Sequence, residues 1–276
     1  MFQCSHAKTI SMRALNQRAV IVGASSGIGL ATAKLFIENN VDVVNISRNQ
    51  APEGTVDLDI LADASTEGSL TAAIDYAAQE GKIDTFIYCA GYSMASPLEH
   101  CEPHDYRYLF DVNFFGIIES LKAVIPYMKE VGGRIILVSS LAGTIPLMFD
   151  SIYSASKAAV DKLAESADLE LKPYGIRVTS VRPGGVATNF TFKRNVYGDE
   201  KIGEYADRQH KAVASLANIE QGGMEPEKVA KAIWQVIDSK NPPVKKVVGA
   251  KNIAFDAVTK VLPSGVVSFL NSTRQE

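Results

Sequence analysis

The chain is predicted to form an α/β fold in which helices cover both faces of a doubly wound parallel sheet. Short runs rich in β-branched residues alternate with longer amphipathic stretches along most of the 276 residues, and this alternation is typical of βαβ units. The run Ile135–Val138 is continuously apolar, as expected for a strand buried on both faces. We therefore expect a three-layer α/β/α arrangement of the Rossmann type with about seven strands.

The elements follow in order along the chain. The predicted strands are Ala19–Val22, Val41–Ile46, Thr55–Leu58, Ile83–Tyr88, Arg134–Val138, Ile176–Val181 and Lys246–Val248. The predicted helices are residues 28–39, 66–79, 104–129, 151–172 and 225–239. Residues 1–16 are polar and aperiodic, so we expect a flexible extension there and a single domain over residues 17–276.

Residues 188–224 interrupt the alternation of strands and helices. An insertion of this length is usually either a functional lid or a disordered segment, and we predict a substrate lid. A C-terminal tail is expected over residues 250–276, and its apolar stretch from Phe255 to Leu270 is predicted to pack on the core or over the pocket rather than to attach to a membrane.

Composition excludes several classes of protein. The chain is 46% hydrophobic and 21% charged, with a net charge of -3, so it can bury a core and has no excess of positive charge for nucleic acid. Its three cysteines, Cys4, Cys89 and Cys101, do not make a disulfide framework, which favours a reducing, cytoplasmic setting. No window approaches the roughly 20 apolar residues of a membrane span.

Five short segments share one expected position, the carboxyl ends of the predicted strands. They are Gly23–Gly29, Ser47–Arg48, Cys89–Gly91, Ser139–Ser140 and Pro183–Gly185. Parallel α/β sheets bind ligands at this edge. Together the five segments predict a cofactor lying across the edge of the sheet.

The segment after the first strand is rich in small residues. It contains Gly23, Ser25, Ser26, Gly27, Ile28 and Gly29. Residues without a Cβ atom let the backbone approach a pyrophosphate, and the helix that follows presents free N–H groups and a positive dipole end. A plain strand-to-helix turn is the alternative for this segment alone, but its position beside the other four favours phosphate binding.

The second strand end indicates which dinucleotide is bound. NAD-binding sites tend to place an acidic residue near this point for the ribose 2′-hydroxyl, whereas this chain has Ser47 and Arg48. A guanidinium there can pair with the 2′-phosphate of NADP. We predict NADP(H) as the preferred cofactor, with NAD(H) as the alternative. Asp59, after the third strand, is either an acceptor for the adenine amino group or a solvated loop residue.

Tyr153 and Lys157 are four residues apart on a predicted helix, so their side chains share one face. A lysine cation favours the phenolate and should lower the tyrosine pKa, which would let Tyr153 carry a proton to or from a substrate oxygen. Ser140 ends a buried strand and can hydrogen-bond that oxygen as charge develops. Asn113, in an apolar helical stretch, needs a specific partner, although a purely structural amide remains its alternative.

With these residues in place, the sequence resembles the short-chain dehydrogenase/reductase family from about Arg18 to Gly249. The shared features are the glycine spacing, Asn113, Ser140, the pair Tyr153 and Lys157, and Arg182–Gly184. The resemblance implies that Tyr153 is the acid/base and that Ser140 orients the carbonyl. It also implies that Lys157 binds the nicotinamide ribose and that Asn113 holds a water in a proton relay.

The resemblance implies further cofactor contacts. Thr188 would bind the nicotinamide carboxamide, Val186 would bond the same group through its backbone, and Asp59 and Ile60 would hold adenine. Cys89, Ala90, Gly91, Pro183 and Gly184 complete the expected cofactor site. The family's usual Asn-Ala-Gly is Cys89-Ala90-Gly91 here, and because a thiol is a weak hydrogen-bonding group we expect weaker cofactor binding. The glycine loop also lacks the basic residue that many NADP-dependent members carry.

Aromatic and apolar residues in the irregular stretches predict an apolar substrate pocket. Its expected walls are Phe190, Phe192, Tyr197, Tyr205, Met94, Leu147, Met148, Phe149 and the tail. His100, Cys101 and His104 lack an evident fourth ligand, so no metal site is predicted.

We therefore expect an NADP(H)-dependent oxidoreductase that moves a hydride between nicotinamide and the carbonyl or secondary alcohol of an apolar, hydroxysteroid-like or lipid-like molecule. The alternatives are an NAD-dependent alcohol dehydrogenase of the same fold and a non-catalytic NADP-binding regulator. The family resemblance also implies a homodimer or homotetramer that pairs through the helices at 104–129 and 151–172.

Overall fold

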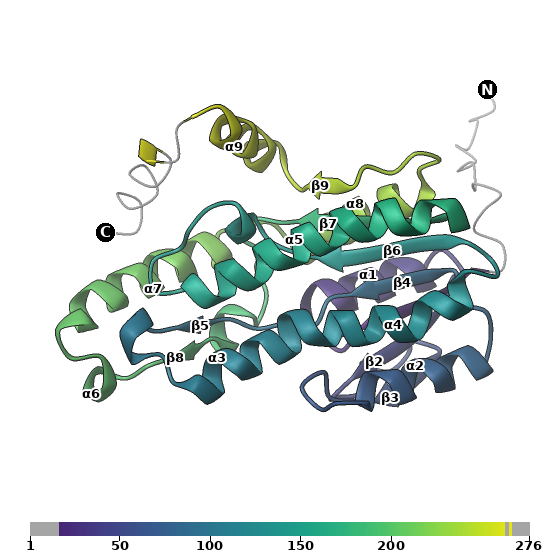
Figure 1. The fold of residues 1–276 in the computed structure, drawn as a ribbon, viewed down its shortest axis with the longest axis horizontal. Coiled ribbons are helices and arrows are strands. Elements are labelled where there is room, and N and C mark those ends of the chain that lie inside the picture. The colour runs from purple at the N-terminus through teal and green to yellow at the C-terminus, as the bar shows by residue number, and fades with distance from the viewer. Residues whose placement is uncertain (1–16, 263–264, 267–276) are drawn as a thin grey trace, which may run out of the picture.

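The computed structural model describes residues 17–262 and 265–266, and a seven-stranded parallel sheet lies at its centre (Figure 1). The strands are β1 (Arg18–Val22), β2 (Asp42–Ser47), β3 (Leu58–Leu61), β4 (Thr85–Tyr88), β6 (Gly133–Val138), β7 (Ile176–Arg182) and β9 (Lys245–Val247). Their order in the sheet is β3-β2-β1-β4-β6-β7-β9. This doubly wound order confirms the predicted fold class and places a topological switch point between β1 and β4.

Helices cover both faces of the sheet. The helices α1 (Gly27–Ile37) and α8 (Pro226–Asp238) lie on one face, and α2 (Ser69–Gln79), α4 (Gly116–Met128) and α5 (Ser151–Leu171) lie on the other. Alternate residues of β1 enter opposite cores: Ile21 packs with Phe36 of α1, whereas Val20 packs with Leu121 of α4. Both cores are apolar, which explains the continuous hydrophobic runs in the central strands.

The predicted helix at 104–129 is interrupted. It consists of α3 (Pro103–Phe110), a π-helical turn over Asp111–Phe115, and α4. Gly116 follows this turn, and a Cβ atom there would lie 2.6 Å from the Tyr88 hydroxyl. The close approach to β4 therefore requires glycine, and the π turn, a feature frequent at functional sites, carries Asn113.

The third strand begins three residues later than the prediction Thr55–Leu58. Leu58–Leu61 pairs with Val44–Ser47 of β2, while the carboxylate of Asp57 accepts a hydrogen bond from the backbone N–H of Val43 at 2.7 Å. The side chain of Asp57 thus replaces the backbone partner that a strand residue would supply. As a result, the carboxyl end of this strand is followed by residues 62–64 rather than by Asp59.

The predicted lid at 188–224 is more regular than the sequence indicates. It contains β8 (Asn195–Val196), α6 (Asp199–Ile202) and α7 (Ala206–Gln221). The strand β8 pairs with β5 (Met94–Ala95) in a separate two-stranded sheet. Only Gln209 and Ala212 of α7 are buried, so this helix has little of the apolar periodicity that reveals helices in sequences.

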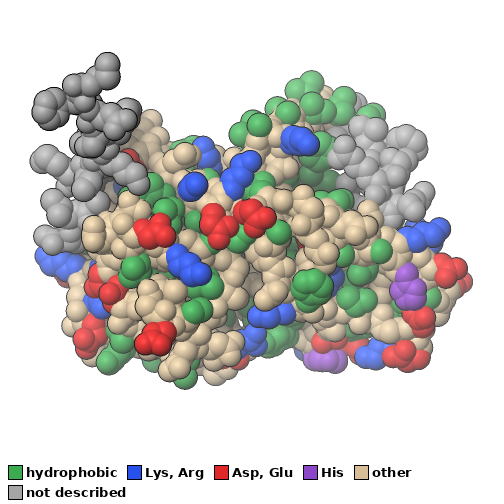
Figure 2. Space-filling view, turned by 180° about the vertical axis from the view of Figure 1, so that it is seen from behind, with side chains coloured by type: hydrophobic (Ala, Val, Ile, Leu, Met, Phe, Trp, Pro, Cys, Tyr) green, Lys and Arg blue, Asp and Glu red, His purple; other side chains and the backbone are tan. Residues whose placement is uncertain are grey.

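The helix α9 (Ala250–Val261) extends above the body of the protein (Figure 1). Figure 2 shows apolar side chains gathered on its outer surface, and the exposed ones include Ile253, Val258 and Val261. Within the described part of the chain, no helix has the length and apolar character needed to cross a membrane. The expected N-terminal extension at 1–16, and the tail at 263–264 and 267–276, lie outside the described residues.

Candidate active site

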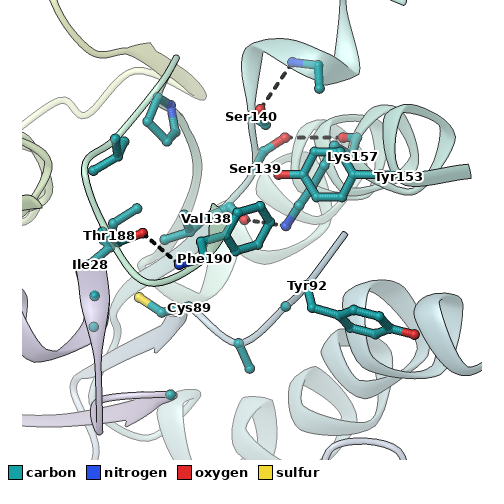
Figure 3. A pocket seen from close by; sticks show the side chains of 18 of the residues that line it. Ile28, Cys89, Tyr92, Val138, Ser139, Ser140, Tyr153, Lys157, Thr188 and Phe190 are labelled. Carbon is teal, nitrogen blue, oxygen red and sulfur yellow. Dashed lines mark hydrogen bonds between the residues drawn. The ribbon is translucent and has the colours of Figure 1, made fainter. Parts of the chain in front are cut away.

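One large cavity, with a volume of about 1030 Å³, runs along the carboxyl edge of the sheet (Figure 3). Every predicted cofactor residue lines it except Asp59 and Ile60, and so do the predicted catalytic residues Ser140, Tyr153 and Lys157. We call the part beside Gly23–Gly29, Arg48 and Asp63 the glycine-loop end. The part formed by Asp150, residues 188–224 and α9 is called the lid end.

The glycine loop is so tightly folded that Gly23 and Gly29 are required where they stand. Gly23 has a φ of +95°, and a Cβ atom on Gly29 would lie 2.0 Å from the carbonyl oxygen of Gly23. Ser26 begins α1 without a side-chain hydrogen bond to the helix, which leaves the first N–H groups of α1 available to an anion. These features fit a dinucleotide whose pyrophosphate lies over the loop.

Asn45 of β2 supports this loop, and the sequence reasoning did not identify it. Its side-chain oxygen accepts a hydrogen bond from Ala24 N at 2.9 Å, and its amide donates to Asp59 at 2.6 Å. Asp59 also accepts from Ala51 N at 3.1 Å. The structure therefore does not bring Asp59 and Ile60 to the cavity, because β3 ends later than predicted. The sequence signal that could have identified Asn45 is a polar amide within the otherwise apolar run of β2.

Asp63 and Arg48 occupy the outer part of the glycine-loop end. Arg48 is exposed, and its guanidinium donates to the Tyr108 hydroxyl at 3.1 Å. Asp63 accepts from Ser65 N at 2.9 Å. Burial alone would raise the pKa of Asp63, but the hydrogen bonds from Ser65 and the charge of Arg48 hold the pKa below its ordinary value. Asp63 and Ala64 therefore line the cavity after β3, whereas the predicted Asp59 and Ile60 do not.

Tyr153 and Lys157 project from one face of α5 into the cavity, and Ser140 lies at the end of β6 (Figure 3). The Tyr153 hydroxyl is hydrogen-bonded to the Ser140 side chain, whose oxygen also accepts from Ala142 N at 3.1 Å. The Lys157 ammonium group donates to the carbonyl of Val138 at 3.1 Å. A proton donor, a second hydroxyl and a cation therefore meet at one place.

The structure does not show the expected lowering of the Tyr153 pKa by Lys157. Burial raises the Tyr153 pKa well above its ordinary value, and the nearby Asp150 raises it further, while Ser140 acts in the opposite direction. Lys157 Nζ lies 5.7 Å from the centre of the tyrosine ring and points to Val138. Burial also lowers the pKa of Lys157 to about 8, because desolvation disfavours each charged form.

Asn113 does not line the cavity, and its amide is bonded within the protein. Its oxygen accepts from Tyr92 N at 3.1 Å, and its nitrogen donates to Tyr92 O at 2.9 Å and to Ser156 Oγ at 3.2 Å. The side chain thus connects the π turn to the loop after β4 and to α5. These bonds fix the backbone around Tyr153 and leave the implied water relay as a prediction.

Two residues of the expected nicotinamide region face the middle of the cavity. Cys89 lines the cavity (Figure 3) and is a free thiol, and burial raises the pKa of this thiol to about 12, so it stays protonated at neutral pH. Thr188 lines the cavity and accepts a hydrogen bond from Phe190 N at 3.2 Å. At this point of the cavity wall the protein therefore has a thiol, where the family's usual asparagine would supply an amide.

A buried charged network that the sequence did not reveal lies at the lid end. This acid–arginine cluster consists of Asp150, Ser93, Arg194, Glu220 and Thr191. Arg194 Nε donates to Ser93 Oγ at 2.7 Å, and Arg194 Nη2 donates to Glu220 at 2.6 Å. Thr191 donates to Glu220 at 2.6 Å, and Ser93 donates to Asp150 at 3.4 Å. The network joins the lid to β5 and to the start of α5.

A second buried network holds α9 over the cavity. Arg182, at the end of β7, lies 3.0 Å from Asp161 of α5 and 3.1 Å from Asp256 of α9. All three side chains are almost completely buried. Phe255 and Val258, on either side of Asp256, line the cavity. The arginine of the Arg182–Gly184 motif therefore connects the sheet to the tail that covers the lid end.

The predicted apolar wall is present in part. Leu147 and Phe190 line the cavity, and the Phe190 ring lies 5.8 Å from that of Tyr153. Met94 and Tyr197 are buried in the cluster behind this wall, whereas Phe192 is 73% exposed. Among the described residues, no three His, Cys, Asp or Glu side chains are arranged to hold a metal ion.

Comparisons with known proteins agree with this geometry. Residues 17–196 match the short chain dehydrogenase family. A 3-ketodihydrosphingosine reductase of Bacteroides thetaiotaomicron is 34% identical over 260 residues, which cover 92% of this chain and 96% of that protein. Retinol dehydrogenase 8 of Bos taurus is 31% identical over 272 residues, covering 89% of this chain and 86% of that protein.

Solved structures share the fold. A short-chain dehydrogenase from Streptomyces avermitilis has a TM-score of 0.76 and 27% sequence identity, covering 88% of this chain and 94% of that one. An aldohexose dehydrogenase of Thermoplasma acidophilum has a TM-score of 0.72 and the same identity, covering 85% and 93% of the two chains. The chain therefore belongs to the short-chain dehydrogenase/reductase family of oxidoreductases, which act on CH–OH or carbonyl groups with NAD(P).

Proposed function

We propose that this protein is an NADP(H)-dependent reductase of long-chain or otherwise apolar ketones, with the reverse oxidation of the secondary alcohol open to the same site. The observation that carries the proposal is the meeting of Tyr153, Ser140 and Lys157 in a cavity that continues to the glycine loop. The bound nicotinamide would supply the hydride. All other steps depend on side chains of this chain.

Ser140 and Tyr153 would both hydrogen-bond the substrate carbonyl oxygen, which polarises the carbonyl and positions it. As negative charge develops on this oxygen, Tyr153 would donate its proton to it. Because the Tyr153 pKa is raised by burial, the hydroxyl is fully protonated at neutral pH and ready for this step. The protonated hydroxyl is the form that reduction needs, whereas oxidation of the alcohol needs the phenolate.

Lys157 and the loop glycines would hold the cofactor. The ammonium group of Lys157 donates to Val138 O, and in the complex it would hydrogen-bond hydroxyls of the cofactor ribose. A positive charge there, together with that of an oxidised nicotinamide, would lower the Tyr153 pKa after cofactor binding. The raised pKa and the acid role of Tyr153 are thus compatible with a reversible reaction.

The preference for NADP(H) is proposed from Arg48. It is exposed at the cavity and held towards it by the hydrogen bond to Tyr108, where a guanidinium suits the 2′-phosphate. An apolar substrate is proposed from Leu147, Phe190 and Phe255 at the lid end. The names of the two curated relatives, a 3-ketodihydrosphingosine reductase and a retinol dehydrogenase, support a long apolar substrate.

A homodimer or homotetramer and a reducing, cytoplasmic setting complete the proposal. Phe115 and Leu169, on the π turn and α5, are 54% and 76% exposed, which supports pairing of α4 and α5 between subunits. The free thiols of Cys89 and Cys101 support a reducing setting.

The test is the oxidation of NADPH by the purified protein against ketones that share one head group and differ in chain length. We expect kcat/KM to rise with chain length, NADPH to be used better than NADH, and Tyr153→Phe to be inactive. Faster turnover of small polar sugars than of apolar ketones would contradict the substrate class. Equal activity of Tyr153→Phe would contradict the mechanism, and tight NADPH binding without any turnover would favour a regulator.

A further inference from the structure

Among the residues that the structure describes, one carboxylate oxygen of Asp150 has no hydrogen-bond partner. Asp150 precedes α5, where an aspartate commonly caps the helix, yet its side chain makes no capping bond. Oδ2 accepts from Ser93 Oγ at 3.4 Å, and the Met94 N–H also faces this carboxylate. Oδ1 has no hydrogen-bond partner in the described part of the chain, although Asp150 is only 2% exposed. A buried acceptor without a donor is unfavourable.

Glu220, the other acid of the cluster, differs in this respect. Its two oxygens accept from Arg194 at 2.6 Å and from Thr191 at 2.6 Å. The guanidinium of Arg194 is thus directed at Glu220, and it reaches Asp150 only through the hydroxyl of Ser93. Within one cluster, Glu220 is satisfied by the protein, whereas Asp150 has room for one more donor.

Asp150, which carries this oxygen, belongs to the wall of the cavity next to the reacting group. Asp150 lines the cavity and lies close enough to Tyr153 for its charge to raise the Tyr153 pKa. Asp150 is also the residue three positions before Tyr153 at the start of α5. A donor bound to Asp150 while a carbonyl is bound to Tyr153 must therefore sit close to that carbonyl.

The charge of the cluster favours a cationic donor. When Asp150 is ionised, it and Glu220 carry two negative charges against the single positive charge of Arg194. Asp150 and Arg194 are buried, and the Glu220 side chain is 12% exposed. Lys157 donates its hydrogen bond to Val138 O rather than to either acid. Lys193 and Lys251 also line the cavity, but both are exposed to solvent, which weakens their effect on the buried acids.

We infer that Asp150 binds an ammonium group on the carbon next to the reacting carbonyl, so that the substrate is a long-chain 2-amino ketone. This inference rests on the proposed ketone reductase activity. It assigns the two ends of the substrate: the apolar chain lies along Phe190 and Phe255, and the amino group lies at Oδ1 of Asp150. A buried acid held by Ser93 would then select the substrate by charge as well as by shape.

The experiment compares three long-chain ketones that are identical except at C2, which carries an amino group, a hydroxyl group or hydrogen. The measured quantity is kcat/KM with NADPH for the wild type, Asp150→Asn and Glu220→Gln. We expect the wild type to prefer the amino ketone over the unsubstituted ketone at least tenfold. Asp150→Asn should remove this preference, and Glu220→Gln should retain most of it because Glu220 has no free oxygen.

Two results on the wild type alone would overturn the inference, whatever the variants do. One is equal use of the amino ketone and the unsubstituted ketone, and the other is equal use of the amino and hydroxy ketones, which would refute a role for charge. An unchanged preference in folded Asp150→Asn would overturn it as well.

Failure of the proposed function is recognised separately. If no ketone oxidises NADPH, the activity proposal fails, and calorimetric binding of the long-chain 2-amino alcohol and its deamino analogue to the NADP-loaded protein decides the inference. At least tenfold tighter binding of the amino alcohol supports the role of Asp150, and equal binding overturns it.

Discussion

The glycine-loop end and the lid end of the cavity meet at Tyr153 but are assembled differently. The glycine-loop end uses short contiguous segments that directly follow β1 and β2. The lid end joins side chains that are far apart in the chain, such as Ser93 and Arg194, which are 101 positions apart. The glycine-loop end presents mainly backbone groups of small residues, whereas the lid end contains buried charged side chains. The predicted catalytic residues lie at the edge of the sheet, so we expect the lid end to select the substrate.

The largest expected effect lies where the two ends meet. Tyr153→Phe should lower kcat about a thousandfold, because loss of a general acid typically has this effect, while NADPH affinity stays within a few-fold of wild type. Lys157→Met should lower both, because the buried ammonium group serves the cofactor as well as the charge balance around Tyr153. Steady-state kinetics and fluorescence titration with NADPH measure the two quantities.

The matched control is Ser139→Ala, since the Ser139 hydroxyl donates to Lys157 O at 3.2 Å and not to the reacting group. It should change kcat much less than Tyr153→Phe. A Tyr153→Phe variant that lost NADPH binding to the same extent as activity would show that the chemistry and the cofactor site are not separable in this way.

The second effect concerns the attachment of the lid end to the sheet. Arg182→Met leaves Asp161 and Asp256 as buried acids without their common cation, and breaking such a pair typically costs about 3 kcal/mol or more of unfolding free energy. Urea unfolding should show this loss. Lys162→Met, which removes an exposed pair with Glu165 on the same helix, should change stability by less than about 1 kcal/mol.

Asp256→Asn tests one of the two acidic partners of Arg182 and leaves the other, Asp161, in place. It should weaken substrate binding more than NADPH binding, because α9 contributes Phe255 and Val258 to the lid end. Equal loss of both affinities would mean that α9 supports the whole cavity rather than one end of it.

The sequence predicted the glycine-loop end well because its signals are local. Gly23–Gly29 and Ser47–Arg48 follow strands whose apolar runs are unambiguous. The misplacement of Asp59 has a specific cause: Asp57 bonds the backbone of Val43 through its side chain, so β3 begins later than its β-branched residues indicate. The doubly wound fold class and the family resemblance were also predicted from the sequence.

The lid end could not be predicted in the same way. Asp150 resembles an ordinary helix cap, and only the position of Ser93 and Arg194 shows that its carboxylate is directed elsewhere. The helix α7 buries only two residues, so its sequence has almost no helical periodicity of apolar residues. The pKa of Tyr153 depends on burial and on Asp150, which spacing along a helix does not reveal.

The third effect is a pH dependence of stability that belongs to the lid end. Burial raises the pKa of Asp150 from 3.8 to about 7; Glu220 acts in the same direction, and Arg194, Ser93 and Met94 oppose it. The folded protein therefore holds this proton more tightly than the unfolded chain, and stability is lost as the pH rises from about 4 to about 7. Between pH 5 and pH 7 this loss is roughly 2 kcal/mol.

Asp150→Asn removes this titration. The difference in unfolding free energy between Asp150→Asn and wild type should therefore grow in favour of the variant between pH 5 and pH 7, and stay constant above about pH 8. Chemical denaturation at four pH values measures it. If the unfolding free energies of the two proteins change with pH in parallel, Asp150 is already ionised in the folded protein at pH 5, and the charge of Arg194 offsets the cost of burying it.

The smallest effect is expected at the rim of the glycine-loop end. Arg48 is exposed and interacts with solvent as well as with Tyr108, so its pair with a 2′-phosphate should contribute only about 1.4 kcal/mol, or tenfold in affinity. Arg48→Asp should lower the ratio of kcat/KM for NADPH over NADH at least tenfold, because it also adds repulsion. Arg48→Lys should retain most of the ratio, since the charge remains. If Arg48→Asp lowers the preference for the 2-amino ketone as well, the two ends are coupled; if it changes only the cofactor ratio, each end selects its own ligand.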